Sequence, residues 1–206
     1  STTNHDPFKI PAEYEKYFQD IHTGNKKYLK AQKTMAYNDF VLREFFEKAK
    51  KEDWYNNTIF IITSDHGLTI NREIPNHPIN GHIPFIIFSE LLTETIIIDK
   101  IVSQVDIMPT IIDLINQDKY LPSLYGISGL KGGDGFACRI SSDYLQWITK
   151  NNIYSELMGQ DNQKCFSFNT IWDIKYNQLP TSSIVNPQIA SNSYIKNAYY
   201  RFKHGK

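Results

Sequence analysis

The sequence has no excess of charge of either sign and no long apolar run. It has 22 Lys and Arg residues and 22 Asp and Glu residues. This balance does not predict electrostatic binding to nucleic acid or to an anionic membrane surface. No apolar stretch approaches the roughly 20 residues that span a bilayer. The sequence also does not open with the basic and then apolar segment of a signal peptide. We therefore expect this chain to be soluble.

Cysteine is scarce. Cys138 and Cys165 are the only two, and their spacing is not that of a metal site. They are either two buried thiols or one disulfide, so cysteine usage leaves the cellular compartment open.

The first part of the chain combines helical and strand patterns. A helix is expected after Gly24 and up to about Lys51, because apolar residues recur there at helical spacing and predict a buried face. The members of that face are Met35, Leu42, Phe45 and Ala49. Strands are expected at 59–63 and 83–88, because residues 59–62 and 83–88 are continuously apolar, a pattern typical of strands covered on both faces. Residues 96–98 suggest a third, shorter strand.

A second helix is expected to start at Asp106. This residue is a good N-cap, and Pro109 falls in the first turn, where its missing N–H costs nothing. Together these patterns predict an α/β fold over residues 1–116, with a helix-flanked, mostly parallel central sheet of the αβα sandwich type.

Residues 117–206 differ in their sequence pattern, with a Gly-rich segment and short apolar runs. This pattern predicts a smaller, strand-rich C-terminal subdomain. The Gly-rich segment 125–135 lacks the Lys-Ser/Thr ending of a phosphate-binding P-loop. Strands are expected at 144–149, 153–158 and 165–174, a loop at 177–187, and a short surface helix at 195–202.

Asp65 and His66 directly follow the first apolar strand, where functional groups of open α/β sheets collect. A carboxylate oxygen beside an imidazole nitrogen suits Zn²⁺ or Mn²⁺ better than an all-oxygen ion site, and Gly67 would keep the backbone unobstructed. The alternative is that Asp65 caps a turn and His66 is a hydrogen-bonded surface residue. A catalytic metal usually needs three protein ligands; the remaining candidates are His5, His77 and His82.

Five motifs in order carry a family resemblance. They are TTNHDPF (2–8), the Tyr37-x-Asp39 helix, NTIFIITSDHG (57–67), HIPFIIF (82–88) and SQVDIMPTIIDLI (103–115). Together they resemble the C-terminal half of the sulfatase-type catalytic domain of the alkaline phosphatase superfamily, in particular that of lipoteichoic acid synthases and phosphoglycerol transferases.

The resemblance implies a mechanism and a set of roles. A Thr or Ser nucleophile, activated by a divalent metal, takes a phosphoryl-linked group from a lipid donor and passes it to an acceptor. Asp65 and His66 match the paired metal ligands, and His5 matches a residue that binds the substrate phosphate. His82 is a further substrate-side candidate. The ion is expected to be Mn²⁺ or Zn²⁺, possibly Mg²⁺, and bound weakly or not at all by this chain alone.

No residue here matches the family nucleophile, so the chain alone is expected to be inactive. Its partners would be the N-terminal half of the same protein, a lipid-linked phosphodiester donor, and a glycan or lipid acceptor, with no nucleic acid. The complete protein would act at the extracytoplasmic face of a bacterial membrane. Two alternatives stay open: a sulfatase or phosphodiesterase that hydrolyses soluble esters, and a non-catalytic glycan- or partner-binding module.

Overall fold

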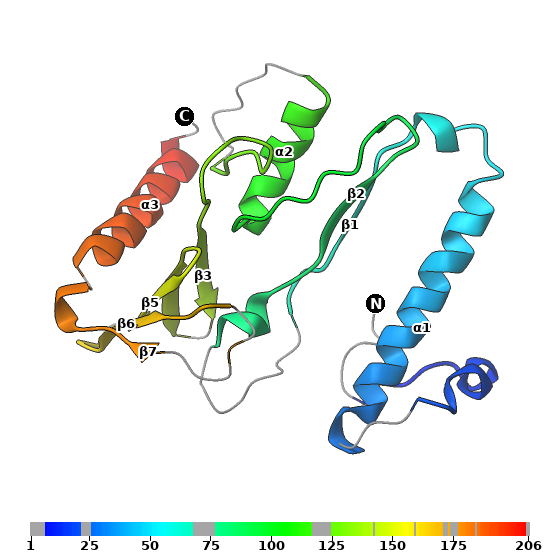
Figure 1. Ribbon diagram of the computed structural model, residues 1–206, viewed down its shortest axis with the longest axis horizontal. Helices are drawn as coiled ribbons and strands as arrows, with labels where there is room; N and C mark the ends of the chain where they lie inside the picture. The colour runs from blue at the N-terminus through cyan, green and yellow to red at the C-terminus, as the bar shows by residue number, and fades with distance from the viewer. Residues whose placement is uncertain are drawn as a thin grey trace. The chain divides into compact units, whose positions relative to one another are not determined.

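The structure is a computed structural model (Figure 1). It describes residues 7–21, 26–67, 77–116, 125–141, 143–158, 160–170, 173, 177–183 and 185–204. The chain forms two compact units, one from residues 1–61 and 87–94 and the other from residues 62–86 and 95–206. The predicted division into 1–116 and 117–206 stays a prediction.

The first unit is built on α1 (Lys26–Ala49), which confirms the expected long helix. A preceding 3₁₀ helix, η2 (Ala12–Phe18), packs beside it (Figure 1). The edge of the Phe18 ring meets the rings of Tyr37 and Phe40 on α1. Aromatic edge contacts of this kind add to the stabilisation that comes from apolar burial.

The predicted buried face of α1 is only partly buried. Ala49 is 3% exposed, but Met35 and Phe45 are about half exposed, at 50% and 47%. Phe46, one position further, contacts the rings of Phe60 and Phe88, and Phe45 also contacts the Phe60 ring. Helical spacing therefore identified the apolar side of α1 but not how much of it is covered.

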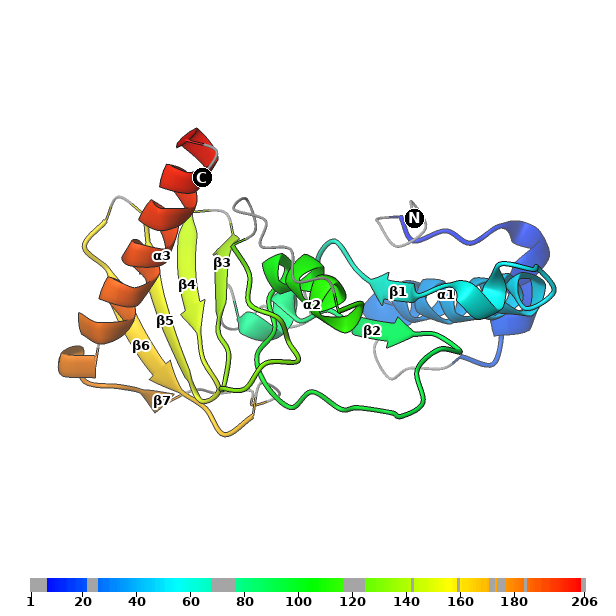
Figure 2. The same cartoon turned by 90° about the horizontal axis from the view of Figure 1, so that it is seen from above.

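Strands β1 (Phe60–Thr63) and β2 (Phe85–Phe88) form a two-stranded sheet close to the expected positions. The expected mostly parallel central sheet is wrong, because the described strands form antiparallel sheets of two and five strands (Figure 2). Alternate residues on both strands are exposed, so a continuous apolar run did not mean burial on both faces. Residues 96–98, expected as a third strand, are irregular.

The second unit holds the five-stranded sheet. Its strands are β3 (Ala137–Ser141), β4 (Tyr144–Ile148), β5 (Asn152–Leu157), β6 (Gln163–Ser167) and β7 (Asn177–Gln178), paired in that order. Two to five residues join β3 to β4, β4 to β5 and β5 to β6, and such short connections make the pairing antiparallel. On one face Ile148, Ile153 and Phe168 form a buried cluster.

The opposite face is covered by α3 (Val185–His204), which lies across the strands (Figure 2). Tyr194 of α3 contacts Trp147 and Phe136, and these two rings stack with centroids 4.3 Å apart. The helix is much longer than the expected 195–202. It begins inside the stretch expected to be a loop, since Pro187 is tolerated in a first helical turn.

Both cysteines are free thiols. Pairing aligns Cys138 with Trp147, Trp147 with Tyr154, and Tyr154 with Cys165. Three strand spacings, about 14 Å in total, therefore separate the two thiols, far more than a disulfide spans. The structure selects the two-thiol alternative.

Candidate active site

Asp65 and His66 lie in the turn that follows β1, with both side chains exposed. Asp65 Oδ1 accepts a hydrogen bond from the backbone N–H of His66 at 2.9 Å. This bond is the main reason that the pKa of Asp65 is lowered, because it favours the charged carboxylate. Asp65 is thus an exposed carboxylate that accepts a hydrogen bond within its own turn. The alternative that Asp65 caps a turn predicted a hydrogen bond of this kind.

The His66 ring is oriented by a main-chain contact. Nδ1 lies 3.0 Å from the carbonyl oxygen of Gly67, and a carbonyl can only accept, so Nδ1 carries the proton. In the neutral ring Nε2 then has a lone pair, and it lies 3.8 Å from Asp65 Oδ2. Two ligands of a tetrahedral metal, each about 2.1 Å from the ion, lie about 3.4 Å apart, so this pair needs only a small adjustment to bind one ion.

Gln104 holds the turn from a distant part of the sequence. Its Nε2 donates to the carbonyl oxygens of Ser64 at 3.0 Å and of Asp65 at 2.8 Å. Gln104 begins the short 3₁₀ helix η5 (Gln104–Asp106), which leads into α2 (Ile107–Leu114). Gln104 belongs to the motif SQVDIMPTIIDLI, but nothing in that motif predicted a role for it.

Asp106 is the N-cap residue of α2, as expected, but its side chain makes no capping hydrogen bond to that helix. Ser103 caps η5, and Asp106 is the acidic partner of a capping box, with Oδ2 accepting from Ser103 N at 2.7 Å. Its Oδ1 accepts from the N–H of Ile127 at 2.7 Å. Asp106 is buried, so one carboxylate fixes the start of the segment that carries Gln104.

The 3₁₀ helix η4 (Pro78–Gly81) lies directly against the turn. A Cβ on Gly67 would come within 2.4 Å of the carbonyl oxygen of Asn80 and 3.1 Å of that of His82. Only glycine fits this approach, which brings the backbone of His82 beside the Asp65–His66 turn. The His82 side chain is exposed.

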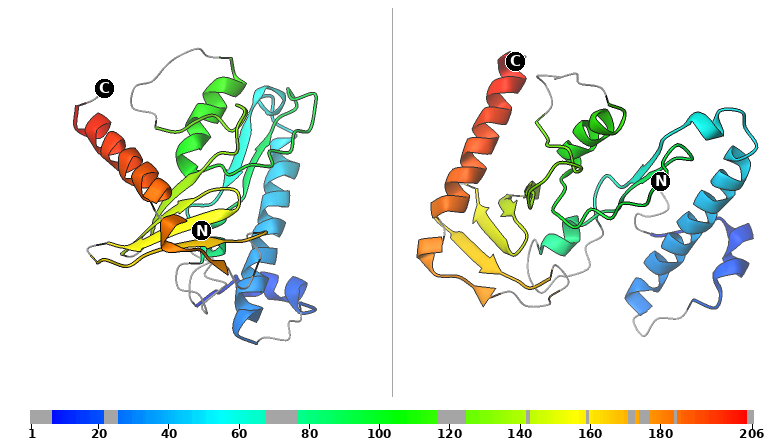
Figure 3. Two further views of the ribbon diagram at one scale, coloured as in Figure 1. Left: turned by 60° about the vertical axis from the view of Figure 1, so that its left-hand side comes forward. Right: turned by 45° about the horizontal axis from the view of Figure 1, so that its top comes forward.

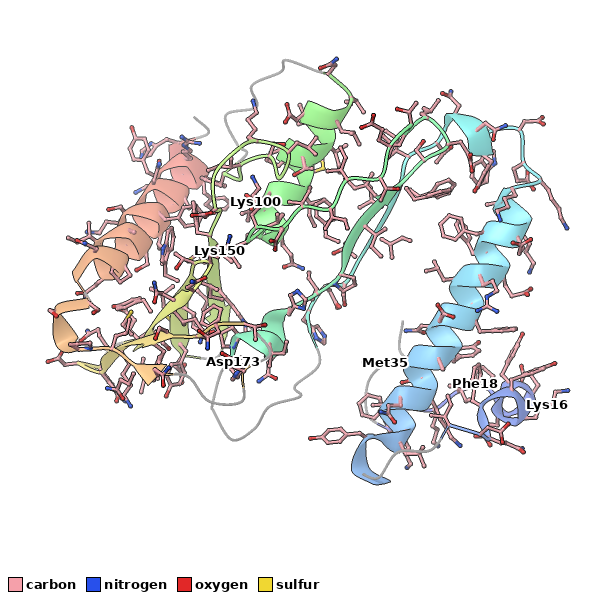
Figure 4. All side chains as sticks on the ribbon, in the orientation of Figure 1. Lys16, Phe18, Met35, Lys100, Lys150 and Asp173 are labelled. Atoms are coloured by element: carbon pink, nitrogen blue, oxygen red, sulfur yellow. The ribbon has the colours of Figure 1, made fainter. Side chains whose placement is uncertain are left out.

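His77 anchors η4 and is 1% exposed. Its Nδ1 accepts from the N–H of Ile79 at 3.1 Å, and its Nε2 lies 3.0 Å from the carbonyl oxygen of Asp173 (labelled in Figure 4). These partners require a neutral ring protonated at Nε2. Burial lowers the pKa of His77, so His77 is a structural anchor beside the site.

Arg139 brings a cation to the other side of η4. A Cβ on Gly81 would lie 2.8 Å from Arg139 Nε, and the guanidinium donates to Gln146 at 3.2 Å across β3 and β4. Burial lowers the pKa of Arg139, but an Arg side chain keeps its charge in proteins. Arg139 was not predicted as a site residue, because its neighbours in the sequence form no recognisable motif.

The described residues contain no group of three or more His, Cys, Asp and Glu that could hold a metal. His5 lies outside the described residues, so its predicted role and the third ligand stay predictions. Asp65 and His66 nevertheless offer the oxygen and nitrogen donors that a divalent ion takes, and this pair fits two positions of a metal site.

The chain belongs to the sulfatase family of the alkaline phosphatase superfamily: the sulfatase model matches residues 1–117. This confirms the resemblance seen in the motifs. The chain is 26% identical to the lipoteichoic acid synthase-like protein YvgJ of Bacillus subtilis (strain 168), and the match covers 81% of this chain and 30% of YvgJ.

A crystal structure of a protein in the alkaline phosphatase superfamily from Vibrio parahaemolyticus shares the fold. It superimposes with a TM-score of 0.73 at 22% identity, covering 97% of this chain and 48% of that protein. The chain thus spans less than half the length of both relatives. Across the residues that the structure describes, no helix is long and apolar enough to cross a membrane.

Proposed function

We propose that this chain contributes the metal-ligand side of a phosphoglycerol- or phosphoethanolamine-transferase-like active site that acts on lipid-linked phosphodiesters. One observation carries the proposal: in a sulfatase-family chain, the Asp65 carboxylate and His66 Nε2 face each other at 3.8 Å. The similarity to a protein described as lipoteichoic acid synthase-like favours a lipid-linked phosphodiester over a sulfate ester.

The residues of this chain have distinct roles in the proposal. Asp65 and His66 hold a divalent metal, Mn²⁺ or Zn²⁺, which when bound lowers the pKa of a nucleophile and neutralises charge on phosphoryl oxygens. Gln104 fixes the carbonyl of Asp65 and so orients the ligand pair. His82 and His5 are proposed to bind the substrate phosphate.

The nucleophile and the acceptor site are proposed to come from a further part of the same protein. The support is coverage, since this chain matches 30% of YvgJ. A lipid-linked donor implies that the complete protein works at the extracytoplasmic face of a bacterial membrane. The family also supports a second candidate, a hydrolase of sulfate or phosphate esters on the same ligand pair.

Calorimetric titration of the chain with Zn²⁺ and with Mn²⁺ tests the proposal. We expect weak, saturable binding, with an affinity that falls at least about 10-fold in Asp65→Asn and in His66→Ala. Even the loss of a residue that only supports a metal ligand lowers metal affinity about 10- to 100-fold. Asp143→Asn and His204→Ala make the same changes at exposed positions elsewhere and should bind as the unmodified chain does.

Binding that persists in both Asp65→Asn and His66→Ala would place the ligands elsewhere and contradict the proposal. If all four variants bind the metal equally weakly, the proposal is also contradicted, and a non-catalytic module is favoured. In the complete protein, transfer from a phospholipid donor and hydrolysis of an aryl sulfate distinguish the two enzymatic candidates.

A further inference from the structure

The helix α3 has one face that packs on the five-stranded sheet. Ser191 is fully buried, and Tyr194 contacts Trp147. The Tyr125 hydroxyl donates to the carbonyl oxygen of Ala198. These contacts fix how the helix is rotated about its axis, so the composition of its opposite face is defined.

The opposite face presents lysines and aromatic rings. Lys196, Tyr199, Tyr200 and Lys203 follow the i, i+3, i+4, i+7 spacing of one helical face, and Ile189 lies two turns earlier on the same face. Tyr199 is 65% exposed, Tyr200 54% and Ile189 60%. Phe202 is 84% exposed but lies one turn after Ala198, on the side of the helix that faces the sheet, and is not part of this face. In both views of Figure 3 one side of α3 is turned away from the strands.

The neutral net charge of the chain conceals an asymmetry. The helix holds three of the 22 basic residues and none of the 22 acidic ones, so the rest of the chain has three more acidic than basic residues. Cations in the last turn stabilise a helix through its dipole. That effect accounts for Arg201 and Lys203 but not for Lys196, two turns from the end, nor for the exposed rings.

We propose that the outer face of α3, formed by Ile189, Lys196, Tyr199, Tyr200 and Lys203, docks on the surface of an anionic phospholipid bilayer. Lysines attract anionic head groups, while tyrosine rings settle at the head-group level with their hydroxyls in water. A symmetric contact with a second copy would bring like charges together. The three cations of this helix are too few for nucleic acid.

This inference does not rest on the proposed catalytic function. It also revises an earlier expectation, because the net charge of the chain did not predict binding to an anionic membrane. The docking is shallow and mainly electrostatic, because the face holds few aliphatic side chains. It should therefore be sensitive to salt, since charges at a surface are screened.

Co-sedimentation with vesicles tests the proposal. The chain should bind vesicles of phosphatidylglycerol and phosphatidylcholine at low salt, and should bind poorly to phosphatidylcholine alone. The double variant Lys196→Glu/Lys203→Glu should bind on the order of 30-fold more weakly, at about 1 kcal/mol for each basic residue lost. Tyr199→Ser/Tyr200→Ser should weaken binding at constant charge.

The matched control is Lys150→Glu/Lys164→Glu, which makes the same change in net charge at exposed positions outside α3 (Lys150 is labelled in Figure 4). It should retain binding at low salt. If both lysine pairs weaken binding equally, net charge alone is responsible and the proposed face is wrong. Binding to neutral vesicles that is as strong as binding to anionic vesicles would also overturn the proposal. So would α3 variants that still bind vesicles but no longer self-associate, because the face would then be a contact between copies of the chain. Circular dichroism confirms that each variant is folded.

Discussion

Single side chains hold the Asp65–His66 turn from positions far away in the sequence. Gln104 lies 39 residues after Asp65, yet it donates to the carbonyl oxygens of both Ser64 and Asp65. The adjacent Asp and His were identifiable because they follow an apolar strand. Gln104 was not, because a side chain that binds a main-chain carbonyl can belong to any residue type with a donor and leaves no local pattern.

Replacing Gln104 with Met removes both donors at similar volume. We expect metal affinity at Asp65 and His66 to fall about 10-fold, as it does when outer partners of metal sites are lost, with little change in the free energy of unfolding. Calorimetric titration and urea unfolding measure the two quantities. Gln160→Met, in an exposed turn, is the control. An unchanged metal affinity in Gln104→Met would show that the two hydrogen bonds of Gln104 do not orient Asp65 and His66.

His77 is expected to make folding stability depend on pH. Its pKa is lowered in the folded chain by burial, so below about pH 6.5 the unfolded chain takes up a proton first. The contribution of His77 to stability is therefore fully present above that pH and declines as the pH falls below it toward about 5. Urea unfolding across this range should show a shallower decline for His77→Asn, whose amide oxygen can still accept from Ile79.

His77→Leu removes both hydrogen bonds of the ring and should lower the free energy of unfolding by about 2–4 kcal/mol, since two buried groups lose their partner. The exposed His204→Ala is the control. A decline with pH that is as steep in His77→Asn as in the unmodified chain would assign the dependence to other histidines.

At the scale of elements, Asp106 joins η5 and α2 to the loop that contains Ile127. In Asp106→Ala two backbone N–H groups lose their acceptor, which should lower the free energy of unfolding by about 2–4 kcal/mol. Asp161→Ala, in an exposed turn, should change it by less than about 0.5 kcal/mol. Thermal or urea unfolding makes the comparison, and equal stability of the two variants would contradict the role given to this carboxylate.

The elements were predictable to different degrees, for physical reasons. The helix α1 was predictable because its apolar and charged residues alternate at helical spacing over many turns. For β1 and β2 the positions were nearly correct but the sheet was wrong, since an apolar run shows that a strand is apolar and not which strands lie beside it. The start of α3 was hidden by Asn, Ser and Pro187, residues that also occur in loops.

At the scale of the whole molecule, we expect this chain alone to show no turnover of a chromogenic phosphodiester or an aryl sulfate with Mn²⁺, Zn²⁺ or Mg²⁺. No residue of the sequence matches the family nucleophile, and covalent catalysis requires one. An alkaline phosphatase serves as the positive control of the assay. Saturable, metal-dependent turnover that survives further purification and disappears in Asp65→Asn would contradict this expectation.

The separation of Cys138 and Cys165 by two intervening strands has a consequence for biogenesis. Burial raises the pKa of Cys138 to about 11 and also raises that of Cys165, so little thiolate is present near neutral pH to react with an oxidant. In an oxidising environment outside the cytoplasm, the folded chain would need neither a disulfide oxidase nor an isomerase. Its thiols would also be poor substrates for oxidation to sulfenic acid.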